Sequence, residues 1–403
     1  MRKQENGKRT CTTEMIPPYG QQKLTRYAET FKELAEMMAC EEDKPALYEV
    51  QRAEDEDRQR MFLKSMHRRN RSIFSEQLDE MAHIMDHVAK ETYREIPMGE
   101  RRFRMVYKAL KQMHVEMKDM LRLENQDGHL EISIVARARG RESVAIEDMA
   151  GMLSVVLNER LLPDRTEKVF VSREYELYHF FEEPNFQVMT GSALAVKETE
   201  RISGDNFCFY EKDDGHLLVL LSDGTGSGIE ACDDSSQVLL LFRKLMDAGF
   251  SKEKAAQILN GSIHLQDEEQ HMPTLDICDI NLYSGELELL KIGASCTYIK
   301  RGRMIDRISG GNLPLGAWDH VEPRSVSREL LDSDYVIMLS DGIIDAAGRG
   351  MGEDVFAEFL GSITCTVPSE IANQILNYCI HQCKGQIKDD MTVLVIGLWE
   401  RMK

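Results

Sequence analysis

Short apolar runs of strand type follow one another from Gln187 to the C-terminus, and acidic or glycine-containing turns separate them. Typical runs are HLLVLLSDG, PTLDICDINLY, DYVIMLSDG and MTVLVIGLW. Helical periodicity appears between the strand-like runs, at about 236–248, 252–263 and 369–384. Many short strands with few helices are typical of antiparallel sheets rather than of repeated βαβ units. We therefore expect an α+β sandwich in residues 187–403.

The chain before residue 187 has a different character. Residues 21–90 contain no glycine and carry apolar residues at helical spacing, which predicts two or more amphipathic helices. We interpret residues 1–99 as a helical regulatory or linker segment. Residues 100–186 predict a small α+β regulatory module, with a helix over 100–121, a strand in HLEISIVARARG, a helix over 146–159 and a strand near Val169.

Composition narrows the class of protein. A chain of 403 residues has room for two or three domains. Its formal net charge of −19 makes nucleic acid a poor first partner, because a broadly acidic surface repels phosphate backbones. The nine cysteines form no CxxC pair, which favours a reducing cytoplasm over a disulfide framework or a zinc site. No apolar run approaches the ~18 residues of a spanning helix, so we expect no membrane span in this chain and a cytoplasmic location.

Acidic residues stand at the ends of several predicted strands. Two predicted strands end in the same tripeptide, SDG. Its aspartate is Asp223 in one strand and Asp341 in the other, and each is followed by glycine. Asp205 precedes a strand in SGDNF, and the pair Asp389 and Asp390 precedes the last one. Each motif alone is also typical of a simple turn or of solvated charges at a strand edge. The ordered set of four is what indicates a site.

Four carboxylates that meet in the folded protein repel one another, so either some of them bind protons or a cation neutralises them. Oxygen ligands favour hard ions such as Mg²⁺ or Mn²⁺ over zinc. The sequence therefore predicts a site for such ions in the C-terminal half.

In these motifs the chain resembles the PPM family of metal-dependent protein phosphatases, and within that family the stage II sporulation protein E type. The resemblance rests on motifs in family order: SGDNF, LSDGTGSG, TLDICDINL, LKIGAS, YIKRG, GNLPLG, MLSDGI and KDDMTV. The upstream region is also similar to the regulatory region of that type. Members usually carry a multi-span membrane segment before this region, and no such segment is visible here, which leaves open association with the membrane through a missing upstream part.

The resemblance implies a four-layer α-β-β-α sandwich and assigns roles to individual residues. It makes Asp205, Asp223, Asp341 and Asp389 the catalytic metal ligands and the carbonyl of Gly224 a further ligand. Asp223 would bridge two Mn²⁺ or Mg²⁺ ions.

Asp390 stands where many family members have Asn, and we expect it to support the ligands rather than to bind metal. Two cations about 3.5–4 Å apart would activate a water for in-line attack on phosphorus, so that no Cys or Ser nucleophile is required.

The resemblance also implies a substrate and a regulatory element. The substrate would be a phosphoserine on an anti-anti-sigma factor of the STAS type, in the activation of a sporulation sigma factor. The helical hairpin over 236–263 would switch the site by moving Gly224 and would form a homodimer together with the N-terminal helices. Simple core packing of its apolar face, which includes Val238 and Leu245, is the alternative reading.

Some functional features of the wider family are not visible in the sequence. No arginine near Asp205 is evident as a clamp for the substrate phosphate, and His216 and His264 are candidates for a general acid by residue type alone. Two other functions stay open: a catalytically silent PPM-fold binding protein, and another two-metal hydrolase such as a nuclease or phosphodiesterase.

Overall fold

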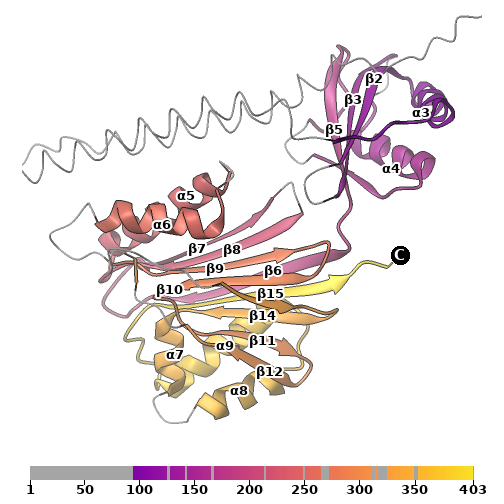
Figure 1. The fold of residues 1–403 in the computed structure, drawn as a ribbon. Helices are drawn as coiled ribbons and strands as arrows, with labels where there is room; N and C mark the ends of the chain where they lie inside the picture. The colour runs from indigo at the N-terminus through magenta and orange to yellow at the C-terminus, as the bar shows by residue number, and fades with distance from the viewer. Residues whose placement is uncertain are drawn as a thin grey trace, which may run out of the picture. The chain divides into compact units, whose positions relative to one another are not determined.

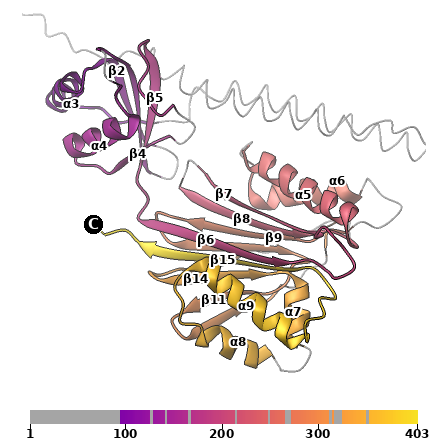
Figure 2. The same cartoon turned by 180° about the vertical axis from the view of Figure 1, so that it is seen from behind.

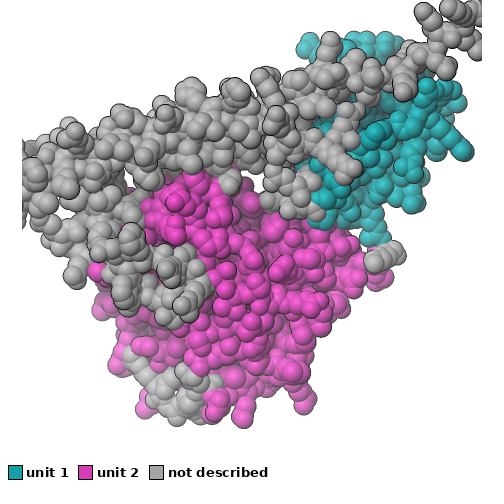
Figure 3. Space-filling view, viewed as in Figure 1, with its two compact units in different colours: residues 1–40, 74–183 teal, residues 41–73, 184–403 magenta. Residues whose placement is uncertain are grey.

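The structure is a computed structural model that describes residues 94–124, 128–140, 143–164, 168–212, 215–247, 250–264, 272–310, 314–315, 325–348 and 353–402. The helices expected between residues 21 and 90 lie outside this part of the chain. The described residues divide between Glu183 and Pro184 into two compact units (Figure 3). The boundaries expected at residues 99 and 186 stay predictions.

The first unit is one antiparallel sheet with two helices on one of its faces (Figure 1). The strand order is β1-β2-β3-β5-β4. Its elements are β1 (Arg94–Glu95), α3 (Glu100–Gln112), β2 (Val115–Glu124), β3 (Leu130–Ala138), α4 (Ile146–Leu157), β4 (Leu161–Pro163) and β5 (Glu176–Glu182). Apolar side chains of both helices and of the sheet form a single core cluster.

The expected helix over 100–121 is wrong in its second half. Helix α3 ends at Gln112, and His114 has a positive φ of 59° that turns the chain into β2. Strong helix formers in VEMKDMLRLE suggested a helix, but pairing along β3 overrides that weak local preference. Near Val169 the structure has only an isolated bridge between Ala145 and Phe170, and β5 was not foreseen.

The second unit contains two five-stranded antiparallel sheets that pack face to face (Figures 1 and 2). One has the order β13-β10-β9-β8-β7 and the other β12-β11-β14-β15-β6. The strands are β6 (Phe186–Ala195), β7 (Asp205–Glu211), β8 (His216–Asp223), β9 (Leu275–Asn281), β10 (Glu286–Ile292), β11 (Thr297–Arg301), β12 (Met304–Ile308), β13 (Ser325–Glu329), β14 (Asp334–Leu339) and β15 (Met391–Glu400). A core cluster that draws side chains from both sheets fills the space between them.

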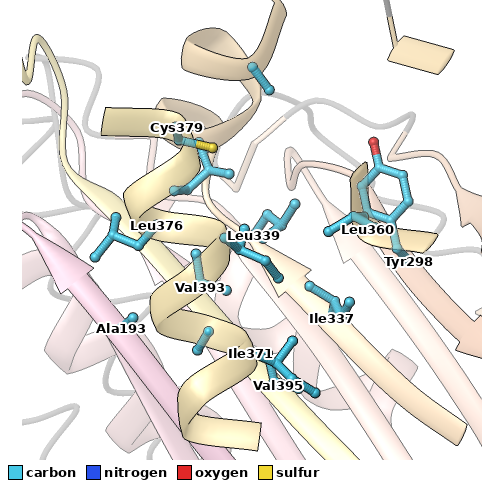
Figure 4. Packing of buried hydrophobic residues seen from close by; sticks show 14 of the residues in the cluster. Ala193, Tyr298, Ile337, Leu339, Leu360, Ile371, Leu376, Cys379, Val393 and Val395 are labelled. Atoms are coloured by element: carbon cyan, nitrogen blue, oxygen red, sulfur yellow. The ribbon is translucent and has the colours of Figure 1, made fainter. Parts of the chain in front are cut away.

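Helices cover the outer faces of both sheets, which completes the expected four layers. Helices α5 (Ile229–Asp247) and α6 (Lys252–His264) lie over the β7–β8 side of the first sheet (Figure 2). Helices α7 (Asp341–Gly348), α8 (Glu353–Ser362) and α9 (Pro368–Gln382) cover the second sheet. Figure 4 shows the second of these interfaces, where Ile371 of α9 lies beside Val395 of β15 within one apolar cluster. The α-β-β-α fold predicted from the sequence is confirmed.

The helices differ from the expectation in two respects. Helix α5 begins at Ile229 rather than near Ser236, directly after Gly228, which has a φ of 79°. Helices α7 and α8 were not foreseen. None of the described helices has the length and apolar character needed to cross a bilayer.

Candidate functional site

Asp205 and Asp223 are direct cross-strand partners at one end of the β7–β8 pair. Opposite residues of an antiparallel pair point to the same face, with Cβ atoms about 4.5–5.5 Å apart. Asp205 is only 4% exposed, and neither of its carboxylate oxygens accepts a hydrogen bond. A buried carboxylate without a partner is costly, so this position calls for a cation or a proton.

The pKa values of both carboxyls reflect this cost. Burial, the charge of Asp205 and the charges of three further aspartates raise the pKa of Asp223 to about 8. Burial, followed by the charges of Asp341 and Asp390, raises the pKa of Asp205 to about 6, although the nearby Thr392 and Ser340 side chains limit the rise. Without a cation, Asp223 therefore holds a proton over much of the neutral range.

Asp341 is the first residue of α7, directly after β14 and Ser340. The residue as a whole is exposed, but burial of its carboxyl, followed by the charge of Asp389, raises its pKa. Asp341 and Asp223 line the same pocket, at the ends of strands from different sheets. The two SDG motifs therefore do meet at one point, as the sequence predicted.

Asp389 and Asp390 differ sharply in their surroundings. Asp389 is exposed, whereas Asp390 is 5% exposed and both of its carboxylate oxygens accept backbone N–H bonds. Lys197 donates to one oxygen at 2.8 Å and Gly204 to the other at 2.7 Å. Asp390 therefore ties down the loop that ends at Asp205, which agrees with the supporting role expected of it.

Glycines allow the backbone to approach closely around these carboxylates. A Cβ on Gly224 would lie 1.9 Å from the carbonyl oxygen of Ala231, and one on Gly342 would lie 2.1 Å from that of Asp390. Helix α5 thus rests directly on Gly224. The expected use of the Gly224 carbonyl as a ligand stays a prediction.

A serine connects the same helix to the loop before Asp205. The Ser235 hydroxyl donates to the carbonyl of Gly204 at 2.6 Å and accepts a hydrogen bond from the Asn206 side chain at 2.8 Å. On the other side, Asp223 and Thr274 are linked by two hydrogen bonds, from the Asp223 N–H to the Thr274 hydroxyl and from the Thr274 N–H to the Asp223 carbonyl. The backbone on both sides of the aspartate pair is therefore fixed.

Sequence reasoning missed one buried carboxylate at this site. Asp276 lies on β9 and lines the pocket that Asp223 and Asp341 also line. It is 1% exposed and forms an ion pair with Lys291 of β10, with 2.5 Å between Nζ and Oδ2. Asp276 belongs to TLDICDINL, which the sequence offered as a motif without giving this residue a role.

The donor set fits hard divalent cations, although in the described part of the chain no three acidic, histidine or cysteine side chains already stand close enough to form a metal site. Two observations support the fit: the unpartnered oxygens of Asp205, and the mutual electrostatic effect of Asp205, Asp223, Asp341 and Asp389. The assignment of these four residues as ligands stays a prediction.

The histidine candidates do not join this cluster. His216 begins β8 and pairs with Asp279, with 2.8 Å between Nδ1 and Oδ1. Asp223 ends the same strand seven residues later, which places it roughly 24 Å away at about 3.4 Å per residue. The side chain of His264 lies outside the described residues. An exposed cation that the sequence reasoning did not use, Arg201, stands four residues before Asp205.

Comparisons with known proteins show which family and fold the chain is similar to. A family model described as stage II sporulation protein E matches residues 213–399, and one described as the regulatory domain of the same protein matches residues 8–181. Stage II sporulation protein E of Bacillus subtilis is 27% identical over 331 residues, which cover 82% of this chain and 40% of that protein. The Priestia megaterium protein of the same name is 28% identical over 338 residues, covering 83% of this chain and 58% of the other.

A solved structure supports the fold of both units. It contains the PP2C phosphatase domain and a fragment of the regulatory domain of SpoIIE from Bacillus subtilis. It matches with a TM-score of 0.59 at 24% identity and covers 87% of this chain and 98% of that one, a likeness that shows the fold alone. This chain therefore spans less than two thirds of the length of the curated relatives, 40% of one and 58% of the other, but matches both the regulatory and the phosphatase regions. Over both regions the chain is similar to stage II sporulation protein E, and so to the PPM protein phosphatases.

Proposed function

We propose that this chain is a Mn²⁺- or Mg²⁺-dependent protein serine phosphatase. The observation that carries the proposal is the buried Asp205–Asp223 pair, in which burial and mutual repulsion oppose the ionisation of both carboxyls near neutral pH. Its position on a PPM fold, beside Asp341 and within electrostatic range of Asp389, supports the same conclusion.

Each acidic residue contributes in a way that follows from its burial. Asp205 and Asp223 would hold the ions on the buried side, together with the Gly224 carbonyl. The exposed residues Asp341 and Asp389 would hold them on the side that faces solvent and substrate. Bound divalent cations neutralise phosphoryl oxygens and lower the pKa of water.

Other residues of the chain position the ligands and contact the substrate. Asp390 and Ser235 hold the loop before Asp205, so that the ligands stay in register. His216 pairs with Asp279 at the far end of its strand, so it does not serve as the acid for the leaving serine oxygen. Arg201 is an exposed cation in the loop before Asp205 and is a candidate contact for the substrate phosphate.

The substrate we propose is a phosphorylated anti-anti-sigma factor of the STAS type, in the activation of a sporulation sigma factor. The relatives' name, stage II sporulation protein E, supports a role in sporulation. The identity of the phosphoprotein rests on the family resemblance.

A homodimer formed by the α5–α6 hairpin and the N-terminal helices is also part of the proposal. The structure narrows which residues could contribute. Val238 and Leu245 of α5 are 4% and 1% exposed, so their apolar surface already packs within the chain. Leu240 is 41% exposed and is the better candidate for contact with a second copy.

The decisive experiment is a Mn²⁺ titration of phosphate release from a phosphorylated STAS protein. Wild type should show metal-dependent release, and Asp223→Asn and Asp389→Asn should each lose it by 100-fold or more, an order of magnitude typical for lost transition-state charge stabilisation. Asp354→Asn on α8, an exposed aspartate away from the site, is the matched control and should behave as wild type.

The outcomes also separate the two rival functions. A wild-type chain that binds Mn²⁺ but releases no phosphate from any phosphoprotein favours a silent binding protein. Metal-dependent cleavage of DNA or of a cyclic nucleotide, without phosphoserine hydrolysis, favours another two-metal hydrolase. Full activity of both Asn variants at every Mn²⁺ concentration would show that the ligand assignment is wrong.

A further inference from the structure

A buried ion pair borders the carboxylate cluster. Asp276 and Lys291 are direct ladder partners on β9 and β10, and their side chains are 1% and 6% exposed. The Lys291 ammonium donates to Asp276 Oδ2 at 2.5 Å and to the backbone carbonyl of Ser295 at 2.7 Å. One lysine therefore holds both the carboxylate and the β10–β11 loop.

The pair lies beside the proposed metal ligands. Asp276 stands opposite Leu221 on β8, two residues before Asp223, so Asp276 and Asp223 project from the same face of the sheet. Asp276, Ser295, Asp223 and Asp341 all line one pocket. The second oxygen of Asp276, Oδ1, is buried and accepts no hydrogen bond. Asp276 thus has an unsatisfied acceptor at the border of a site that attracts cations.

Stability alone does not explain this pair. Burying two charges costs desolvation energy, and well-packed apolar residues in place of such a pair are often neutral or stabilising. The Lys291 ammonium differs from an apolar side chain at this place because it carries a charge. It provides a fixed positive charge that neutralises Asp276 from within the protein.

We propose that Lys291 is a positioning residue of the metal site and acts through Asp276. By neutralising Asp276, it keeps this carboxylate from competing with Asp205 and Asp223 for the divalent cations. By holding the Ser295 carbonyl, it also fixes the wall of the pocket. This inference rests on the proposed function, because it assumes that divalent cations bind at the aspartate pair.

The test measures Mn²⁺ binding by titration calorimetry and by electron paramagnetic resonance at pH 8, on full-length variants checked for folding by circular dichroism. Lys291→Met leaves Asp276 uncompensated, so Mn²⁺ should bind about tenfold more tightly or one further ion should bind per chain. Asp276→Asn leaves the ammonium uncompensated, so Mn²⁺ affinity should fall about tenfold.

Two further variants serve as controls. The double variant Asp276→Leu with Lys291→Met removes both charges and should bind Mn²⁺ within about threefold of wild type. Lys291→Arg keeps the cation and should restore wild-type binding. If the pair had only a structural role, both single variants would bind Mn²⁺ more weakly. Changes of opposite sign in the Mn²⁺ affinity of the two variants therefore distinguish a positioning role from a role in folding.

The outcomes are separable. The inference is overturned if the single variants Lys291→Met and Asp276→Asn shift the Mn²⁺ affinity in the same direction, or if neither shifts it. If Lys291→Met fails to fold, the Mn²⁺ affinity of Asp276→Asn is compared with that of the double variant. Equal affinities of these two variants would overturn the inference. A wild-type chain that binds no Mn²⁺ overturns the proposed function and this inference together.

Discussion

Asp205 and Asp223 face each other across the β7–β8 ladder, so two carboxylates that are 18 positions apart in sequence become nearest neighbours at the end of one sheet. Ionising both leaves Asp205 buried, unpartnered and beside a like charge. The pair is therefore a source of instability in the metal-free chain and a source of affinity for divalent cations.

Replacing Asp205 by Asn should reveal both effects. In EDTA at pH 7.5 the free energy of unfolding should rise by roughly 1–3 kcal/mol, because a buried charge is removed at nearly constant volume. Adding Mn²⁺ should then stabilise the variant much less than wild type. Urea denaturation with EDTA and with Mn²⁺ measures both quantities, and Asp354→Asn is the control. An Asp205→Asn chain that gains as much stability from Mn²⁺ as wild type does would contradict the ligand role.

The metal-free chain should lose stability as pH rises from about 4 to about 8. The pKa of Asp223 is about 8 in the folded state, against an ordinary value of 3.8. Between these values the folded chain keeps a proton that the unfolded chain releases, so the free energy of unfolding falls by at most about 1.4 kcal/mol per pH unit for this group. Above pH 8 the contribution levels off.

Denaturant titrations of wild type and Asp223→Asn in EDTA, from pH 5 to pH 8, measure this slope. The variant should show a shallower decline. Parallel curves for the two proteins would rule out Asp223 as the group responsible.

Gly224→Ala should disturb the contact between the site and α5. The new Cβ would lie 1.9 Å from the carbonyl oxygen of Ala231, so either the strand end or the helix must shift, at a cost of about 1–3 kcal/mol. Mn²⁺ affinity should fall with stability, and amide hydrogen exchange in α5 should accelerate.

Gly151→Ala is the matched control for this change. Gly151 lies within α4 and has nothing within 4 Å of an added Cβ, so alanine should stabilise the chain by roughly 0.5–1 kcal/mol. Unchanged exchange in α5 of Gly224→Ala would show that the helix does not depend on this contact.

Leu240→Asp tests the proposed dimer without disturbing the core. Its exposed side chain on α5 would bring a charge into an apolar contact, which should shift the chain from dimer to monomer by tenfold or more in dissociation constant. Light scattering across a concentration series measures the mass. Ser362→Asp, which adds the same charge at an exposed position on α8, is the control. A mass that is identical for wild type and Leu240→Asp at every concentration would remove α5 from the interface.

The sequence by itself determined the sandwich class and the placement of the aspartates at strand ends. Both follow from local signals: apolar runs punctuated by acidic turns predict the strands, and an Asp-Gly at the end of a strand marks its boundary. For the same reason β8, β14 and β15 were foreseen close to their observed limits.

Only the tertiary structure decided which side chains meet. The pairing of Asp205 with Asp223 and of Asp276 with Lys291 depends on strand register, which is set by packing between segments distant in sequence. The strand β2 formed where helix formers predominate, because its partner β3 and the core beneath outweighed a preference of a few tenths of a kcal/mol per residue. Local patterns determine most strands of the sandwich, whereas the site arises from contacts that no single segment encodes.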